Sequence, residues 1–162
     1  MTERVRMLIV GDGPVADALC SMASAVGWTS STANSLADTE RSLGDADAVV
    51  VTSHHDDLDG PAIRAALAAG TSYVGAMGSR RTQARRREWL LIHGVAEDQL
   101  AELHAPVGLD IGADDPGEIA VSILAEIIAE RRGAGGSVPS VSDRTGAIHP
   151  DREPGTAYCP GG

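Results

Sequence analysis

The stretch VRMLIVGDGPVADALCSMASAVGW, residues 5–28, decides the fold. It opens on an apolar run that ends at Gly11, and this pattern predicts a short buried strand. From Pro14 onward the apolar residues recur at helical spacing, and Gly27 predicts the end of that helix. A strand that passes through a glycine turn into a helix is the opening unit of a parallel α/β sheet.

The same alternation continues along the chain. DAVVVTS (residues 47–53) and SYVGAMG (72–78) predict further strands, whereas TSSTAN (29–34) is unusually polar for a second core strand. Helices are expected over 36–43, 61–70 and 80–93 and from Pro116, where Asp115 and Glu118 match a capping box, with a short helix or turn over 97–105. We therefore predict a Rossmann-like α/β fold: a doubly wound, mostly parallel sheet with helices on both faces.

The 162 residues are enough for one domain with a real core, which must be built from Ala, Val, Leu and Ile because Phe is absent. Residues 1–133 are assigned to this domain. Residues 134–162 are rich in Gly, Pro and Ser, and we expect a mostly disordered tail there. Cys20 is expected to be a small buried residue and Cys159 an incidental one, with no disulfide framework.

The net charge of −10 argues against nucleic-acid and anionic-membrane partners. No apolar run is long enough to span a bilayer, and the chain enters a strand directly rather than through a signal peptide, so a cytoplasmic location is expected. All basic side chains other than histidine are arginines, and five of them gather in GSRRTQARRREWL (residues 78–90).

The first candidate binding element is VGDGPVA, residues 10–16. Gly11 permits a tight turn, Gly13 permits close approach of the backbone to a phosphate, and Ala16 takes the place of the third glycine of a GxGxxG-type loop. Pro14 and Val15 open the helix, whose N-terminus offers free N–H groups and a partial positive charge. This loop is expected to bind an anionic ligand.

Two features argue against ordinary NAD binding. Asp12 places a carboxylate in the loop that would meet a pyrophosphate, although we include it among the residues that contact the ligand. No acidic residue ends the second strand, where a ribose hydroxyl would be held; neutral Asn34 is the nearest candidate. NAD(P) is therefore the less favoured cofactor.

The third strand is followed by SHHDDLDG, residues 53–60. Its composition would suit a metal site, or a solvated loop in which Asp59 caps the next helix. Because this loop follows a parallel strand, it should lie beside the glycine loop, and we expect His54 to contact the ligand. No metal ligand and no catalytic residue is assigned.

The second candidate anion site is at the start of the arginine-rich helix. Gly78 ends a strand, Ser79 is a good N-cap, and Arg80 lies in the first helical turn, where a cation opposes the helix dipole. A bound phosphate that accepts from the helix N-terminus, the Ser79 hydroxyl and a bidentate Arg80 would explain this arrangement. Some of the remaining arginines are expected to pair with acidic side chains.

Three blocks together resemble the C-terminal Rossmann domain of the XdhC/CoxI family. They are VTSHHDDLD (51–59), YVGAMGSRRTQARRREWL (73–90) and HAPVGLDIGADDPGEIAVSILAEIIAERRG (104–133), and the resemblance covers Leu8 to Gly133. Where members tend to carry T-H-D-H, this chain has S-H-H-D, so only His54 is carried over. Asp110, in the GLDIGA segment, is expected either to face the ligand crevice or to bond to a nearby backbone.

The resemblance implies a maturation and insertion factor for a molybdenum hydroxylase of the xanthine dehydrogenase or CO dehydrogenase type. Such a factor binds the molybdenum cofactor, as molybdopterin or its dinucleotide form, holds it during sulfuration and transfers it to the apo-hydroxylase. It would be a cofactor-binding chaperone rather than a catalyst. Implied partners are the apo molybdenum hydroxylase, a cysteine desulfurase and, because this chain is expected to be a stand-alone Rossmann half, a separate XdhC N-terminal-type polypeptide. A homodimer is also implied.

Two alternatives stay open from the residues. The glycine loop is compatible with an NAD(P)-binding oxidoreductase-like domain. The arginine helix is compatible with a pure protein-interaction module that docks on an acidic partner.

Overall fold

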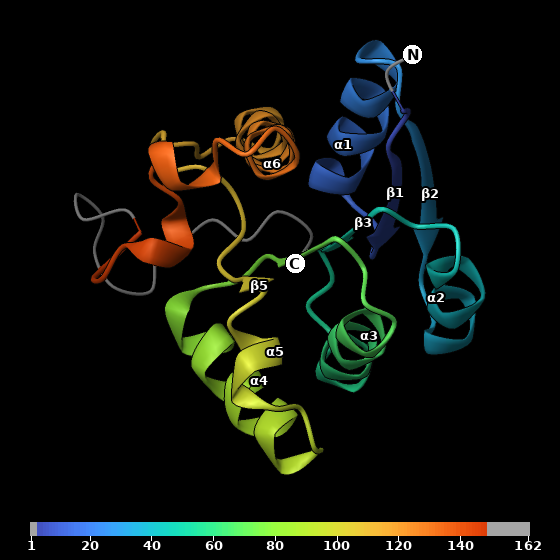
Figure 1. The fold of residues 1–162 in the computed structure, drawn as a ribbon, viewed down its shortest axis with the longest axis vertical. Helices are drawn as coiled ribbons and strands as arrows, with labels where there is room; N and C mark the ends of the chain where they lie inside the picture. The colour runs from blue at the N-terminus through green and yellow to red at the C-terminus, as the bar shows by residue number, and fades with distance from the viewer. Residues whose placement is uncertain (1–2, 149–162) are drawn as a thin grey trace.

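The computed structural model describes residues 3–148 and shows a five-stranded, wholly parallel sheet with the strand order β2-β1-β3-β4-β5 (Figure 1). The strands are β1 (Arg6–Val10), β2 (Thr29–Ala33), β3 (Ala48–Val51), β4 (Tyr73–Ala76) and β5 (Leu103–His104). The helices are α1 (Pro14–Ala25), α2 (Leu36–Leu43), α3 (Asp56–Ala68), α4 (Arg80–Ile92), α5 (Glu97–Leu100) and α6 (Pro116–Arg131), followed by the 3-10 turns η1 (Gly135–Ser137) and η2 (Val141–Asp143). The predicted Rossmann-like α/β class is confirmed.

Side chains alternate along the strands, and this alternation divides the core into two layers. Met7 and Ile9 of β1 pack with α1 and α6 on one face, whereas Leu8 and Val10 pack toward α2, α3 and α4 on the other. Helices therefore cover both faces, as a parallel sheet requires. Strand β2 lies at the sheet edge with four exposed residues out of five, which explains its polar sequence.

Local signals located most helix starts correctly. Pro14 opens α1, the Ser79 hydroxyl accepts from the Thr82 amide at the start of α4, and Asp115 precedes α6. The Glu118 carboxylate accepts from the Asp115 amide at 3.3 Å, in keeping with the predicted capping box.

Helix α3 corrects one prediction. It begins at Asp56 rather than at Pro61, so the proline lies inside the helix. The early start is favoured because the acidic first turn, with Asp56 and Asp57, complements the positive end of the helix dipole. Asp59 is consequently not a cap but a fully buried residue within α3.

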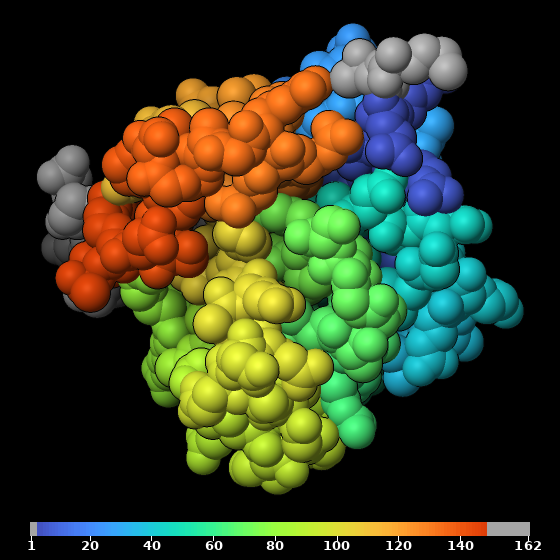
Figure 2. Space-filling view, in the orientation of Figure 1, coloured from blue at the N-terminus to red at the C-terminus, as the bar shows by residue number. Residues whose placement is uncertain are grey.

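The first part of the segment expected to be a tail contains short ordered turns in the structure. Residues 134–148 include η1 and η2, and backbone hydrogen bonds join this segment to the domain: the Val141 amide donates to Gly108 O at 2.9 Å, and the Asp110 amide donates to Pro139 O at 2.8 Å. Figure 2 shows this segment, orange to red, lying against the body of the molecule. These backbone hydrogen bonds offset the conformational entropy that is lost when the segment becomes ordered. Burial of apolar side chains contributes little here, because the segment contains few of them. Residues 149–162, including Cys159, lie outside the described residues.

A buried polar cluster joins β4 and β5 to α6. The Tyr73 hydroxyl donates to the fully buried Glu126 carboxylate, which also accepts from the Gly108 amide at 3.1 Å. The His104 ring stacks on Tyr73 with a centroid distance of 4.6 Å, and its Nδ1 lies 3.4 Å from Glu126 Oε1. Burial, and then the negative charge of Glu126, raise the pKa of Tyr73 well above its usual value.

Candidate functional site

The carboxyl ends of the parallel strands bring the predicted loops to one edge of the sheet. The loops after β1, β3 and β4 all leave this edge, and the β3 loop lies between the other two because of the strand order. Strands lie about 4.8 Å apart, so the turns that follow β1 and β4 start about 10 Å from each other. The strand order reverses at β1, because β2 lies on one side of β1 and β3 on the other. Open α/β sheets bind ligands at such a switch point.

Gly11 is required by the close approach of two strand ends. Its φ of +126° falls in the region that favours glycine, and a Cβ atom at this position would lie 2.6 Å from Thr52 Oγ1 and 2.7 Å from the Ser53 amide nitrogen. Its own amide donates to Ala33 O at 2.9 Å, which ties the turn after β1 to the end of β2. The sequence predicted a tight turn here, and the structure adds that the turn abuts the loop containing His54.

The N-terminus of α1 carries the features of an anion-binding turn. Gly13 is the N-cap with φ +101°, and no side chain caps this helix. The first cap bond is internal, from the Asp17 amide to Gly13 O, and across residues 3–148 the amides of Val15 and Ala16 have no acceptor. Uncapped N–H groups at a helix N-terminus suit a phosphate oxygen. Asp12 is exposed beside them and disfavours dense negative charge.

His54 and His55 stand in the loop between β3 and α3, and both are exposed. Buried Ser53 shapes this loop, because its hydroxyl accepts from the His55 amide at 3.1 Å. His54 is therefore placed at the switch point, between the two glycine turns. Within the described part of the chain, no three His, Cys, Asp or Glu side chains gather as they would to hold a metal ion.

The turn after β4 is built as the sequence indicated. Gly78 has φ +136°, and a Cβ atom there would lie 3.1 Å from Gln83 Nε2 and 3.2 Å from Arg86 Nη1. Ser79 is the N-cap, and its hydroxyl accepts from the Thr82 amide at 3.2 Å. Gln83 donates to Ala76 O at 3.2 Å, so the first turn of α4 is tied to the strand that precedes it.

A buried ion pair beneath these loops was not predicted. Arg86 of α4 pairs with Asp59 of α3, and both side chains are almost completely buried. The same guanidinium donates to Met77 O and, at 3.2 Å, to Ser53 O, so it binds the ends of β3 and β4 together. Helical spacing was the available signal, because Arg86 lies on the same face as buried Leu90. Arg85 and Arg87 form exposed pairs with acidic side chains, as expected.

Arg80 contacts the C-terminal segment in this structure. Its Nε donates to Gly146 O at 2.9 Å and its Nη2 to Val141 O at 2.8 Å. These bonds use donors that the sequence analysis assigned to a phosphate. A ligand that engages Arg80 in the bidentate manner must therefore compete with residues 141–146.

Asp110 is part of the same C-terminal contact. Its carboxylate lies 3.3 Å from Arg144 Nη1, and its side chain is largely buried. Arg144 also donates to Ile148 O at 2.6 Å. The acidic group is thus matched by a cation from the segment, an interaction that neither sequence-based alternative for Asp110 included.

A parallel sheet with this strand order, covered on both faces and carrying glycine turns at its carboxyl edge, defines a Rossmann-like domain. A family model described as the XdhC Rossmann domain matches residues 7–127. The chain belongs to this family, which confirms the resemblance seen in its sequence blocks.

Three relatives show the range of proteins to which the chain is similar. Molybdenum cofactor insertion chaperone PaoD of Escherichia coli (strain K12) is 33% identical over 128 residues, covering 78% of this chain and 40% of PaoD. A probable xanthine dehydrogenase subunit of Bacillus subtilis (strain 168) is 38% identical over 86 residues, covering 53% of this chain and 24% of that protein. A Bacillus halodurans crystal structure described as a xanthine dehydrogenase superposes with a TM-score of 0.66 at 27% identity, covering 83% of this chain and 46% of the other.

The chain spans less than half the length of each of these relatives. Among residues 3–148, no helix is both long enough and apolar enough to cross a membrane.

Proposed function

We propose that this chain binds the molybdenum cofactor and serves as an insertion chaperone for a molybdenum hydroxylase. The observation that carries the proposal is the uncapped N-terminus of α1, whose free amides at Val15 and Ala16 face the switch-point edge of an XdhC-family Rossmann domain. The similarity to PaoD supports the choice of cofactor and of task.

The residues of the carboxyl edge fit a phosphate-bearing pterin. Gly11 and Gly13 keep side chains away from the loop, and Val15 would donate its amide to phosphate oxygens. Gly78 and Ser79 would form the opposite wall, and His54 would contact the ligand between the two turns. The cofactor supplies the molybdenum centre of the finished hydroxylase, whereas this chain binds, orients and releases it.

Four further residues complete the proposed site. Pro14 fixes the entry into α1, and Asp12 would accept from hydrogen-bond donors of the ligand rather than approach its phosphate. Arg80 would bind phosphate after exchanging its bonds to Val141 and Gly146, and Asp110 would face the crevice once Arg144 moves away.

We also propose the molecular setting of this task. The recipient is an apo-hydroxylase of the xanthine dehydrogenase or CO dehydrogenase type, and a cysteine desulfurase supplies sulfur while the cofactor is held. The chain acts together with an XdhC N-terminal-type polypeptide, as a homodimer in the cytoplasm.

Anaerobic titration calorimetry with molybdopterin and with its cytidine dinucleotide form tests cofactor binding. We expect the Arg80→Ala variant to bind about 10- to 150-fold more weakly, equivalent to about 1.5–3 kcal/mol for one charge-assisted bidentate contact. Arg81→Ala is the matched control, because Arg81 is exposed on the same helical turn. Equal affinities for the wild type and Arg80→Ala would remove Arg80 from the site.

A parallel titration with NAD and NADP tests the alternative function. We expect neither heat nor thermal stabilisation, because β2 ends at Ala33 and neutral Asn34 follows it. Saturable nicotinamide binding without molybdopterin binding would replace the chaperone proposal with an oxidoreductase-like one.

A further inference from the structure

A pocket lies at the opposite edge of the sheet from the candidate cofactor site. It is lined by residues that precede β1 and β2 and by the end of α6. We call it the Trp28 pocket. One acidic residue, Glu3, lines it, and the other residues relevant here are Arg4, Val26, Trp28, Ile128, Arg131 and Arg132. The five residues of β1 separate the two edges by about 16 Å, so the two sites share no residue.

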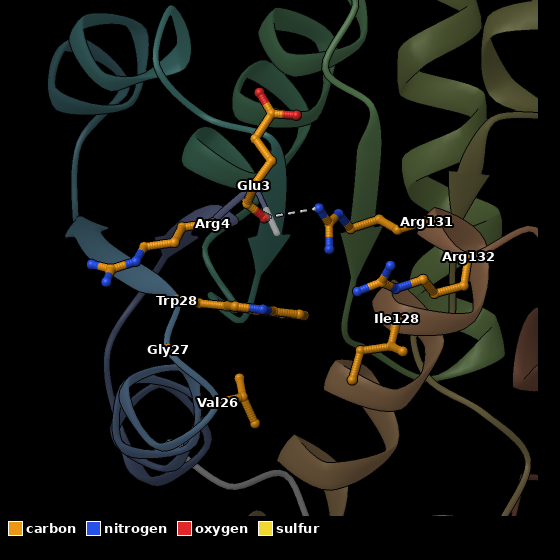
Figure 3. Close-up of a pocket in the computed structure, with 8 residues that line it drawn as sticks. All are labelled: Glu3, Arg4, Val26, Gly27, Trp28, Ile128, Arg131 and Arg132. Carbon is orange, nitrogen blue, oxygen red and sulfur yellow. Dashed lines mark hydrogen bonds between the residues drawn. The ribbon is translucent and has the colours of Figure 1, made fainter. Parts of the chain in front are cut away.

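The Trp28 pocket combines an apolar wall with a basic one. Figure 3 shows the indole of Trp28 between the side chains of Val26 and Ile128 on one side and the guanidinium groups of Arg131 and Arg132 on the other. Val26 is 50% exposed and Ile128 40% exposed, although both are large aliphatic residues. Trp28 itself is partly buried against the core formed by α1 and α6, which gives the pocket a rigid base.

The arginines of this pocket have no carboxylate partners. Six arginines elsewhere form ion pairs with acidic side chains, but in the described range, 3–148, Arg4, Arg131 and Arg132 form none. Arg131 makes one hydrogen bond, at 3.3 Å to Glu3 O, which leaves most of its donors available. In a chain of net charge −10, such a concentration of unpaired cations indicates an anionic occupant.

The C-terminal end of α6 gives a partial explanation for these cations. A helix dipole favours basic residues in its last turn, as Arg131 is. The dipole does not require an exposed indole, nor the aliphatic residues beside it. Tryptophan and arginine around an apolar centre are instead the residues that dominate binding energy at protein–protein interfaces.

The size of the pocket distinguishes a polypeptide from a free small molecule. Its volume is about 290 Å³, at the lower end of the roughly 300–1,000 Å³ of pockets that enclose drug-sized ligands. Such an open pocket fits a polypeptide better than a free small molecule. One leucine-sized side chain would lie between Val26, Trp28 and Ile128, and neighbouring carboxylates of the same polypeptide would bind the arginines. The matched region covers only 40% of PaoD and 46% of the superposed structure, so each of these relatives contains further polypeptide beyond that region.

We infer that the Trp28 pocket docks an acidic polypeptide segment that inserts one apolar side chain against Trp28. The segment comes from a partner polypeptide, and its carboxylates bind Arg131 and Arg132. The inference does not depend on the cofactor proposal, because the pocket lies at the other edge of the sheet.

Nuclear magnetic resonance of the full chain provides the test, because its two tryptophans report on different places. Trp28 lines the pocket, whereas Trp89 stacks on His93 at the end of α4. The probe is the capped peptide Glu-Asp-Leu-Leu-Glu-Asp, and its neutral counterpart is Gln-Asn-Leu-Leu-Gln-Asn. We expect the indole N–H signal of Trp28 to shift saturably with the acidic peptide, with no shift of Trp89 and none with the neutral peptide.

Two double variants distinguish specific binding at the Trp28 pocket from non-specific electrostatic attraction. Arg131→Ala with Arg132→Ala should raise the Kd for the acidic peptide about ten-fold or more. Arg64→Ala with Arg81→Ala removes the same charge from exposed positions elsewhere and should leave the Kd within about two-fold. Equal losses in the two double variants, or the absence of a Trp28 shift, would overturn the inference.

Two other occupants have their own signatures, and either would also overturn it. A Trp28 signal that shifts on dilution of the protein alone, together with a dimer in sedimentation that the Arg131→Ala, Arg132→Ala variant lacks, would assign the pocket to a second copy of the chain. A saturable shift with inorganic phosphate but not with the peptide would assign it to a free anion.

Discussion

At the scale of single residues, Gly11 shows how a site can depend on a missing side chain. The Cβ atom of an alanine would lie 2.6 Å from Thr52 Oγ1, and the backbone φ of +126° is itself unfavourable for alanine. We expect Gly11→Ala to lower the free energy of unfolding by at least about 2 kcal/mol, measured by urea denaturation.

The matched control for that substitution is Gly70→Ala. Gly70 also has a positive φ, +69°, but a Cβ atom there would have no neighbour within 4 Å. Its loss should be about 1 kcal/mol and should report the backbone cost alone. Equal losses at the two positions would show that contact with the β3 loop contributes nothing.

The ionisation of Tyr73 should lower the free energy of unfolding at alkaline pH. Its pKa is raised in the folded state by burial and by Glu126, whereas an unfolded tyrosine loses its proton near pH 10. The unfolded state therefore releases a proton first, and the stabilising contribution of neutral Tyr73 declines as the pH rises above about 10. No lysine titrates in this range, because the chain contains none.

We expect Tyr73→Phe to be less stable than the wild type by about 1–3 kcal/mol at pH 7, since it removes one donor from buried Glu126. Between about pH 9.5 and 11 its free energy of unfolding should fall less steeply than that of the wild type. Denaturant titrations at each pH measure both effects, and identical pH slopes would contradict the role given to Tyr73.

At the scale of elements, the Arg86–Asp59 pair couples α4 to α3 and to the ends of β3 and β4. Removal of one partner leaves a buried charge unmatched, so Arg86→Met should cost about 3–5 kcal/mol of unfolding free energy. Asp59→Leu combined with Arg86→Met should recover part of this loss, because no unpaired charge remains. A double variant as unstable as the sum of the single variants would argue against direct coupling.

Arg85→Ala serves as the neighbouring control in the same denaturation experiment. Arg85 pairs with Asp56 at 2.9 Å, but both side chains are mostly exposed. Its loss should stay below about 1 kcal/mol, because solvent screens such pairs.

The helices and strands also show which element boundaries can be predicted from local sequence. The starts of α1, α4 and α6 were predictable because Pro14, Ser79 and Asp115 act on adjacent backbone. Strand β5 was missed because its two residues, Leu103 and His104, are strand only through pairing with β4. The start of α3 was placed too late because its acidic first turn has the composition of a loop.

In the candidate site, too, some features were predictable from local sequence and others were not. The glycine turns were predictable because each follows its strand directly in the sequence. The partners of Arg80 were not, since Val141 and Gly146 lie more than sixty residues away and belong to a segment with few apolar residues. Asp59 and Arg86 were hidden because charged residues are normally exposed, and only their helical spacing indicated burial.

At the scale of the whole molecule, the net charge of −10 opposes the binding of an anionic cofactor even though its site offers free amides. At an ionic strength of about 0.01 M the screening length is about 30 Å, and the approaching ligand experiences the charge of the entire protein. At about 0.1 M this length is about 10 Å, so that the ligand experiences mainly the groups around the site. We therefore expect the association rate constant for molybdopterin to rise several-fold over this range, as measured by anaerobic stopped-flow absorbance.

This dependence would be opposite to that of a site dominated by arginines, where added salt slows association. A variant with Glu40→Gln and Glu88→Gln provides the control, because both residues are exposed and lie outside the candidate site. It should associate faster than the wild type at low salt, and the two rates should converge at about 0.1 M. An association rate that falls with added salt would mean that local cations such as Arg80, rather than the field of the whole protein, govern the encounter.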